Sequence, residues 1–294
     1  MKKADTTRRV LITGGSGFTG QHLVAALEQK GHQVHVPASL DLTDSTNVAQ
    51  ALHSVQPDAV VHLGAISFAA HGDSMPYYET NTLGTLNLLA AIAEQKIELS
   101  HFIFASTAAV YGNQGRPVLG EGLTPQPDGD YGISKLAAEH LVRVHSNARS
   151  TVVFRPFNYT GVGQSEQFII PKLVKHYALR EPEIELGNID VAREFNDVRW
   201  AVSAYVAALD YEGAQVTLNL CTGNAHKLRD VMMTLESITG HQPKLKTNQA
   251  FVRANDLPSL AGDPERLNAE FVLAQPSSLN DTLGWMCDYY ASSR

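Results

Sequence analysis

The first 156 residues alternate between short apolar runs and amphipathic segments. Runs made almost entirely of apolar residues fit strands that are covered on both faces of a sheet. Residues 58–65 are such a run and residues 101–107 are another buried strand, and further strands are predicted at residues 9–13, 33–37 and 151–156. Segments with apolar residues at helical spacing lie between them, at residues 20–31, 44–55, 80–96 and 131–146. The alternation predicts an α/β fold, in which a parallel sheet carries helices on both faces.

The pattern is less regular after Pro156. Short helices are predicted at residues 168–179 and 199–210, mixed with short strands such as residues 217–221 and with loops rich in proline and glycine. This change predicts two domains, residues 1–156 and residues 157–294, of which the second is a smaller C-terminal lobe. A chain of this kind can cross between its lobes more than once.

Three glycines, Gly14, Gly17 and Gly20, stand where the first strand meets the first helix. Glycine permits tight turns and lets the backbone approach a ligand closely, because it has no Cβ. The N–H groups and the dipole at the start of the following helix favour an anion there. A strand before the glycines and an amphipathic helix after them are the context of a dinucleotide site. We therefore predict a doubly wound sheet of the Rossmann type that binds the pyrophosphate of a cofactor.

A second group of residues carries acid–base chemistry. Tyr131 and Lys135 are four residues apart on a predicted helix, so they share one face. A lysine ammonium beside a phenol favours the phenolate and lowers the pKa of the tyrosine, which can then exchange a proton with a carbonyl oxygen. Ser106 and Thr107 end the buried strand before this helix, where a hydroxyl could hold the same oxygen.

Composition and charge narrow the class of protein. The chain has 294 residues, 44% of them hydrophobic and 18% charged, with a net charge of −7, and its pI is about 5.9. Nothing in these values indicates a nucleic-acid partner, and no run approaches the ~20 apolar residues of a membrane span. The histidines and the two cysteines, Cys221 and Cys287, show no metal-binding spacing, so we expect no metal. Free thiols indicate a reducing, cytoplasmic location.

Nine stretches of the sequence resemble one family when they are taken together. They are "TGGSGFTG", "DLTD", "VVHLGA", "NTLGTLNLL", "FASTAAVYG", "YGISK", "RPFNYTG", "REFNDVRW" and "VRANDLPSLAGDPERL". The combination is similar to the extended short-chain dehydrogenase/reductases, the NAD-dependent epimerase/dehydratase family. The resemblance implies an oxidoreductase that binds NAD(H) or NADP(H) in residues 1–156. It also implies a nucleotide-diphosphate sugar as substrate, bound mainly by residues 157–294.

The resemblance also implies roles for single residues. Tyr131 is the acid/base and Lys135 its partner, which also holds the nicotinamide ribose; Thr107, rather than Ser106, is the catalytic hydroxyl. Asn81 matches a structural asparagine near the active site. The other cofactor-binding positions implied are Gly14, Gly17, Phe18, Gly20, Asp41, Leu42, Leu63, Gly64 and Ala65. The substrate-binding positions implied, besides Thr107, are Asn158, Arg193 and Arg253.

The residues after Thr107 narrow the reaction type. Family dehydratases and decarboxylases place a glutamate there as an extra base, whereas this chain has Ala108 and Ala109. The 3,5-epimerase/reductases use a cysteine near that loop, and this loop has none. A 4-ketoreductase and a 4-epimerase use the same site residues, so both remain open. The resemblance favours reductases that convert GDP-4-keto-6-deoxy-D-mannose to GDP-rhamnose, although "VRANDLP" lacks the proline that this group tends to have after the arginine. A dinucleotide-binding sensor without catalysis is the alternative of another class.

Two further expectations concern cofactor and assembly. The usual ribose-binding position falls near Pro37, Ala38 and Ser39, where the chain has neither an acid that would repel a 2′-phosphate nor an arginine that would hold one. NADP(H) is favoured over NAD(H) because reductive biosynthesis would use it. The resemblance also implies a homodimer, in which the helices at residues 81–95 and 131–145 form a four-helix bundle with those of a second chain.

Overall fold

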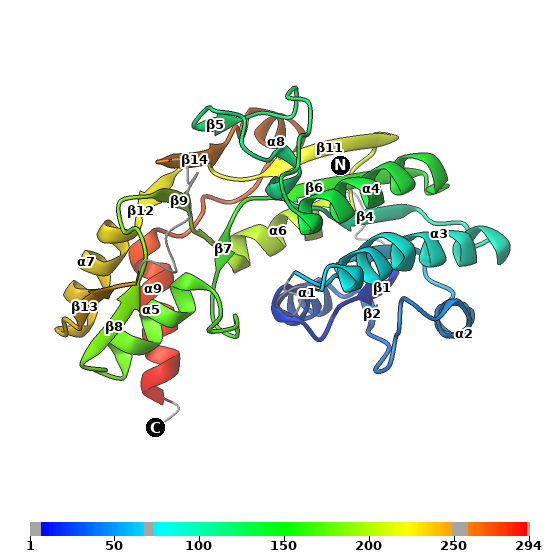
Figure 1. The fold of residues 1–294 in the computed structure, drawn as a ribbon. Helices are drawn as coiled ribbons and strands as arrows, with labels where there is room; N and C mark the ends of the chain where they lie inside the picture. Colours follow the sequence, from blue (N-terminus) through cyan, green and yellow to red (C-terminus); the bar gives the residue numbers. More distant parts are fainter. Residues whose placement is uncertain (1–6, 68–72, 249–257, 293–294) are drawn as a thin grey trace. The chain divides into compact units, whose positions relative to one another are not determined.

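The computed structural model describes residues 7–67, 73–248 and 258–292. The chain divides into two units (Figure 1). The first unit contains Met1–Asn113, Glu121–Pro156 and Val202–Asn219, and the second contains Gln114–Gly120, Phe157–Ala201 and Leu220–Arg294. The chain thus passes between the units several times. The assignment of cofactor binding to one domain and substrate binding to the other remains a prediction.

A six-stranded sheet forms the centre of the first unit, in the strand order β11-β6-β4-β3-β1-β2. Its strands are β1 (Arg9–Thr13), β2 (Gln33–His35), β3 (Ala59–His62), β4 (His101–Ala105), β6 (Ser150–Pro156) and β11 (Gln215–Leu220). The pairings of β1 with β2 and β3, of β3 with β4, and of β4 with β6 are all parallel. The strand order reverses at β1, which is where ligands bind in sheets of this kind. The parallel sheet with its helices confirms the predicted fold class.

The helices of this unit are α1 (Phe18–Gln29), α2 (Ser45–Val55), α3 (Gly84–Glu94), α4 (Asp130–His145) and α6 (Val198–Ala208), which begins in the second unit. Side chains of α2, α3 and α4 share one buried cluster with Leu11, Val60 and Phe102, which lie opposite one another on β1, β3 and β4. Phe154 of β6 faces the other way, because successive strand residues alternate between faces. Its ring contacts that of Tyr205 on α6, 5.0 Å away. Both faces of the sheet are therefore covered, which explains the almost continuous apolar runs.

A local sequence signal explains where α2 begins, whereas η1 and β11 differ from expectation. Asp44 caps α2, accepting hydrogen bonds from the backbone N–H groups of Thr46 (2.9 Å) and Asn47 (3.2 Å). The single helix expected from residue 80 is instead a π-helix, η1 (Tyr77–Leu83), that leads into α3. Residues 217–221, expected in the smaller lobe, lie mostly in β11 of the large sheet. A π-helix is rare and frequently marks a functional site.

The second unit combines small sheets with a helical cluster. Its strands are β5 (Val118–Leu119), β7 (Tyr159–Thr160), β8 (Glu183–Leu186), β9 (Ala192–Glu194), β10 (Asn196–Asp197), β12 (Ala225–Lys227), β13 (Lys244–Thr247) and β14 (Ser259–Gly262). They pair in the orders β12-β9-β14-β5, β10-β7 and β13-β8. Its helices are α5 (Ile169–Ala178), α7 (Leu228–Thr239), α8 (Glu265–Glu270) and α9 (Leu279–Ser292). Leu173, Val231 and Leu283 are fully buried where α5, α7 and α9 pack together.

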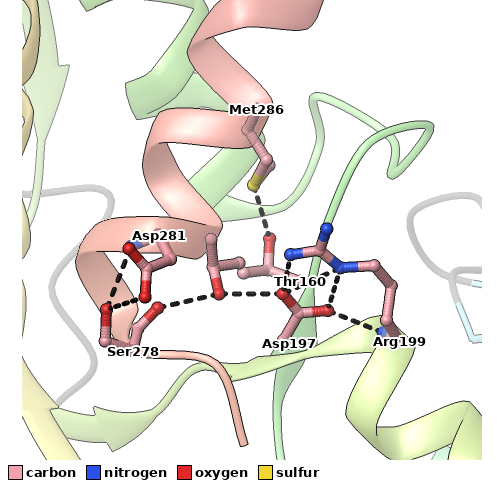
Figure 2. Close-up of polar contacts among 7 residues, drawn as sticks. Thr160, Asp197, Arg199, Ser278, Asp281 and Met286 are labelled. Carbon is pink, nitrogen blue, oxygen red and sulfur yellow. Dashed lines mark hydrogen bonds and ion pairs between the residues drawn. The ribbon is translucent and has the colours of Figure 1, made fainter.

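Asp197 connects the start of α6 to α9 within this unit. Its carboxylate is buried, and Figure 2 shows it beside the side chain of Arg199. It accepts a hydrogen bond from Arg199 N at 2.7 Å, which caps α6, and one from Thr282 Oγ1 at 3.0 Å. The guanidinium of Arg199 lies 4.0 Å from the ring centroid of Trp285 on α9. The carboxylate of Asp197 thus holds the start of α6 and the first turn of α9 together.

The structure also bears on the membrane question. No helix within the described ranges has the length and apolar character needed to cross a membrane.

Candidate active site

Three parallel strands end at the same edge of the large sheet. Thr13 at the end of β1 pairs with His62 at the end of β3, and His62 pairs with Phe104 near the end of β4. The glycine turn follows β1, Leu63 to Ala65 follow β3, and Ser106 and Thr107 follow β4. The structure therefore brings these predicted cofactor and hydroxyl positions to one edge.

The glycine turn has the geometry that a phosphate cradle requires. Gly14 has φ +71°, a left-handed conformation that favours glycine, and its carbonyl accepts a hydrogen bond from Gly17 N at 3.0 Å. A Cβ on Gly20 would lie 2.3 Å from Gly14 O, so the first turn of α1 needs glycine to pack against the loop. The helix begins at Phe18, after Gly17, which has no side chain to cap it. A helix start without a side-chain cap, directly after a glycine turn, is the arrangement found at pyrophosphate sites.

A cavity of about 200 Å³ adjoins this turn. It is lined by Thr13, Gly14, Leu40, Asp41, Leu42, Gly64, Ala65, Ile66 and Thr80. Five of these residues are predicted cofactor positions. A Cβ on Gly64 would lie 2.9 Å from both Leu42 Cδ1 and Thr13 Oγ1, so glycine keeps this wall of the cavity open. Apolar walls beside the glycine turn fit an adenine dinucleotide.

The loop that carries Asp41 is held by its own hydrogen bonds. Asp41 Oδ1 accepts from Thr43 N at 2.8 Å and from Thr43 Oγ1 at 2.7 Å, and both bonds hold the pKa of this exposed carboxyl below its usual range. Asp41 N donates to Asn47 Oδ1 at 2.8 Å. On the other side of the turn, Leu63 N donates to Thr13 O at 3.1 Å. The backbone is thus held in place at Asp41 and at Leu63.

Tyr131 and Lys135 lie one helical turn apart on α4, as predicted. Tyr131 is half-buried, and its ring centroid lies 6.0 Å from that of Tyr77 on η1. Lys135 is fully buried, with Nζ 4.2 Å from the ring centroid of Phe104. Burial lowers the pKa of Lys135 to about 7, and the carboxylate of Glu139, one turn further along α4, opposes that effect. A lysine with a pKa near neutrality can exchange a proton during a reaction.

The structure distinguishes the two candidate hydroxyls. Ser106 is buried and its Oγ donates to Glu139 Oε1 at 2.5 Å. Glu139 also accepts two hydrogen bonds from Arg155, from Nε at 2.9 Å and Nη2 at 2.7 Å. Thr107 is only half-buried, and its Oγ1 accepts from Ala109 N at 3.1 Å, at the start of the short 3₁₀ helix η2 (Ala108–Tyr111). Ser106 is thus committed to an ion-pair network behind the site.

Gly132 and Asn81 hold α4 close to its neighbours, η2 and the loop after β3. A Cβ on Gly132 would lie 2.7 Å from Ala109 O, so glycine lets the helix approach η2 closely. Asn81 is fully buried, and its Oδ1 accepts from Ile66 N at 2.8 Å. Its Nδ2 donates to Ile66 O at 3.0 Å and to Ser134 Oγ at 3.1 Å. Asn81 therefore joins the loop after β3 to the residue that precedes Lys135.

Of the predicted substrate residues other than Thr107, Asn158 and Arg193 lie in the second unit. Asn158 is exposed, and its carbonyl accepts from Asn196 N at 3.0 Å. Arg193 is half-buried in the middle of β9, where Nη1 donates to Ala192 O at 2.7 Å. Arg253 lies outside the described residues. The sugar-binding roles of all three remain predictions. In the described part of the chain, no group of three histidine, cysteine or carboxylate side chains could hold a metal ion.

Three buried polar residues of this site were missed by sequence reasoning: His62, Glu139 and Arg155. Each left a weak signal, because His62 and Arg155 interrupt apolar strand runs, where a buried polar residue needs partners. Glu139 stands four residues after Lys135, on the same face of its helix. These signals do not predict which residues form hydrogen bonds with the three side chains, because those residues lie on other elements of the fold.

Comparison with known proteins gives a concordant result. The sequence model of the NAD dependent epimerase/dehydratase family matches residues 10–221. The chain is 35% identical to the GDP-6-deoxy-D-talose 4-dehydrogenase of Aggregatibacter actinomycetemcomitans, over 88% of this chain and 90% of that protein. It is 32% identical to the GDP-6-deoxy-D-mannose reductase of Pseudomonas aeruginosa, over 95% of this chain and 92% of that protein. The solved structure of RMD from Pseudomonas aeruginosa, complexed with NADPH, is similar with a TM-score of 0.88 and 30% identity, over 98% of this chain and all of that one.

The parallel sheet, the glycine turn and the tyrosine–lysine helix define a Rossmann-type, dinucleotide-dependent oxidoreductase. The chain belongs to the NAD dependent epimerase/dehydratase family, which confirms the resemblance found in the sequence.

Proposed function

We propose that this protein reduces the C4 ketone of a nucleotide-linked 4-keto-6-deoxy sugar, of the GDP-4-keto-6-deoxy-D-mannose type, to a product of the GDP-rhamnose type. It is an NAD(P)-dependent oxidoreductase that acts on a nucleotide sugar. The observation that carries the proposal is the position of Thr107 and of the Tyr131–Lys135 pair. Thr107 follows β4 at the edge of the sheet that has the glycine turn, and Lys135 Nζ lies over the ring of Phe104 near the end of that strand. The relatives of the chain are named for chemistry at GDP-linked 6-deoxy sugars.

Each residue of the site has a separate part in this reaction. The nicotinamide, when bound, supplies a hydride to C4. Tyr131 donates its phenolic proton to the C4 oxygen, and the hydroxyl of Thr107 donates a hydrogen bond to the same oxygen. Lys135 stabilises the phenolate that remains, and its pKa of about 7 suits it to pass on a proton from solvent. Ala108 and Ala109 carry no group that could remove a proton from the carbon beside the ketone, which disfavours dehydration.

For the nucleotide sugar itself, we propose that Asn158, Arg193 and Arg253 bind the sugar and the diphosphate. The planar guanidinium fork of arginine matches a phosphate in charge and in geometry. Arg193→Lys keeps the charge and removes the fork, so the Michaelis constant for the sugar is expected to rise while the affinity for cofactor stays unchanged. A rise in the dissociation constant for NADPH instead would place Arg193 in another role.

For the cofactor, we propose a preference for NADP(H) over NAD(H). The segment from Val36 to Ser39 contains no carboxylate that would repel a 2′-phosphate. Ser39→Asp is expected to weaken NADPH binding at least about tenfold and to leave NADH binding nearly unchanged, because a carboxylate repels the extra phosphate. Asn147→Asp, which adds the same charge at an exposed position after α4, is the matched control. Fluorescence titration of both cofactors measures the effect; equal losses for both cofactors would contradict the preference.

For assembly, we propose a homodimer formed through α3 and α4. Ile133 and Val144 of α4 are 41% and 64% exposed, and Leu83, just before α3, is 53% exposed. Ile133, Ala137, His140 and Val144 recur at helical spacing, so they form one face of α4. Light scattering should give twice the chain mass of 31.9 kDa, and Val144→Glu should shift it towards one chain. A single-chain mass for the unaltered protein at micromolar concentration would contradict the dimer.

For location, we propose the cytoplasm. Cys221 and Cys287 are free and buried thiols, which suits a reducing compartment. Fractionation of cells that express the tagged protein would test this; recovery outside the cytoplasmic fraction would contradict it.

The decisive experiment for function follows the absorbance of NADPH. Purified protein is incubated with GDP-4-keto-6-deoxy-D-mannose, beside Tyr131→Phe and Thr107→Val. We expect oxidation by the unaltered protein and a rate lowered at least about a hundredfold by Tyr131→Phe. Binding of NADPH without oxidation by any GDP-, dTDP- or UDP-linked keto-sugar would favour a sensor. Inversion at C4 of an ordinary nucleotide sugar without net oxidation of cofactor would establish the 4-epimerase.

A further inference from the structure

His62 is a fully buried histidine at the carboxyl end of β3, among aliphatic and aromatic side chains. Both of its ring nitrogens have a partner. Nδ1 lies 2.6 Å from Thr13 Oγ1, and Nε2 lies 2.9 Å from Thr85 Oγ1. The two threonines are buried as well. The imidazole therefore joins the last residue of β1 to the first turn of α3, in the middle of the site edge.

The proton on this ring can be assigned from its neighbours. Thr85 Oγ1 donates to Asn81 O at 2.6 Å, so towards His62 it can only accept, and Nε2 must carry the hydrogen. Gly64 N donates to Thr13 Oγ1 at 3.0 Å, which leaves the hydroxyl of Thr13 to donate to Nδ1. All donors then point one way along a single chain, from Gly64 through Thr13, His62 and Thr85 to Asn81. The ring in this chain is the neutral Nε2–H tautomer.

The surroundings oppose any change in that state. Burial, with the charge of Lys135 as the smaller cause, lowers the pKa of His62 to about 3. A proton on Nδ1 would also turn Thr13 from a donor to an acceptor and break the direction of the chain. A neutral imidazole offers an acceptor on one edge and a donor on the other, which is what two threonine hydroxyls on opposite sides require.

Both ends of the chain reach the cavity beside the glycine turn. Thr13 and Gly64 line the cavity directly. Asn81, at the other end, holds both backbone polar groups of Ile66, which also lines the cavity, and it contacts Ser134 on α4. His62 lines no part of the cavity, yet it connects the strand that leads into the glycine turn with the asparagine that contacts the catalytic helix.

We propose that His62 is a positioning residue for cofactor binding: its fixed Nε2–H tautomer couples the wall of the cavity at Thr13 and Gly64 to Asn81. It touches no cofactor atom and transfers no proton. The proposal rests on the proposed use of this cavity by the cofactor. It predicts that removing the imidazole of His62, or the hydroxyl of Thr85 that it contacts, weakens cofactor binding in addition to any loss of stability.

The first test compares variants of Thr85 and of His62. Thr85→Val keeps the size of the side chain and removes the acceptor for Nε2–H, whereas Thr85→Ser retains a hydroxyl. We expect a dissociation constant for NADPH at least about tenfold higher for Thr85→Val, as for His62→Leu, and near the original value for Thr85→Ser. His101→Asn is the matched control, because His101 is also buried in this sheet but lies at the amino end of β4, bonded to Ser100 and to the carbonyl of Tyr211. It should lower the thermal midpoint and leave the dissociation constant within twofold.

The second test observes the tautomer in the protein without cofactor. Nitrogen-15 NMR of the labelled histidine should show a pyrrole-type Nε2 and a pyridine-type Nδ1, unchanged from pH 6 to pH 8. An Nδ1–H tautomer, a cation, or tight NADPH binding by Thr85→Val would overturn the proposal. Failure of the unaltered protein to bind either cofactor would overturn the proposed function instead, and the tautomer would still be decided by the NMR measurement.

Discussion

Lys135 is expected to make the fold less stable at neutral pH than at alkaline pH. Its side chain is fully buried, with Nζ over the ring of Phe104, and burial holds its pKa near 7 against an ordinary value of 10.5. Below pH 7 both the folded and the unfolded chain hold the proton, so the full cost of a buried charge is present. As the pH rises from 7 to 10.5 the folded protein releases its proton first, and that cost disappears.

The structure sets the size of this effect. A pKa of about 7 in the fold and 10.5 in the unfolded chain corresponds to a destabilisation of about 5 kcal/mol at pH 7 or below. Lys135→Met removes the charge and keeps a long apolar side chain in the same space. The variant should therefore have the higher free energy of unfolding at pH 7, and its advantage should shrink by about 2 kcal/mol between pH 7 and pH 9.

Urea denaturation of both proteins between pH 6 and pH 9 measures this difference. The control is Lys30→Met, because Lys30 is exposed at the end of α1, and its effect on stability should not change over this range. His62, with a pKa near 3 in the fold, stays neutral in both folded proteins over this range, so its contribution cancels from the difference between them. A stability difference for Lys135→Met that is independent of pH, or one that grows as the pH rises, would refute a buried lysine with a lowered pKa.

Two further predictions concern the frame around the site. Glu139→Gln leaves the guanidinium of Arg155 buried without a charged partner, so the free energy of unfolding measured in urea should fall by about 3–5 kcal/mol; a loss below about 1 kcal/mol would show that the pair is solvated. Gly20→Ala places a Cβ 2.3 Å from Gly14 O, so the dissociation constant for NADPH should rise at least about tenfold. Gly284→Ala in α9, where an added Cβ meets no described atom within 4 Å, is its control, and unaltered cofactor binding by Gly20→Ala would contradict the phosphate role of the turn.

Much of this site could be predicted from local sequence. The apolar runs locate the strand ends, and the spacing of Gly14, Gly17 and Gly20 between a strand and a helix indicates a turn for a phosphate. Tyr131 and Lys135 share a helix face through spacing alone. These features need only a few neighbouring residues, and the parallel order of the strands then gathers them at one edge.

The buried polar contacts could not be predicted in this way, because their partners are distant in the sequence. Ser106 meets Glu139 across 33 positions, and His62 meets Thr13 across 49. The π-helix η1 was not expected either. Within it, the side chain of Asn81 contacts Ile66 and Ser134, which lie 15 and 53 positions away in the sequence. For β11 the apolar run predicts a strand. It does not predict that the strand returns to the large sheet to pair with β6, because that pairing joins segments distant in the sequence.

The most direct test of the proposed reduction follows an isotope. NADPH with deuterium at the transferred position of the nicotinamide is incubated with the protein and GDP-4-keto-6-deoxy-D-mannose, and the product is examined by NMR. A reductase places one deuterium at C4 of the sugar for each NADPH oxidised, and the configuration at C4 distinguishes a rhamnose product from a talose product. Product without deuterium at C4, or C4 inversion of a nucleotide sugar with no NADPH consumed, would contradict the reductase and establish a different use of Tyr131 and Lys135.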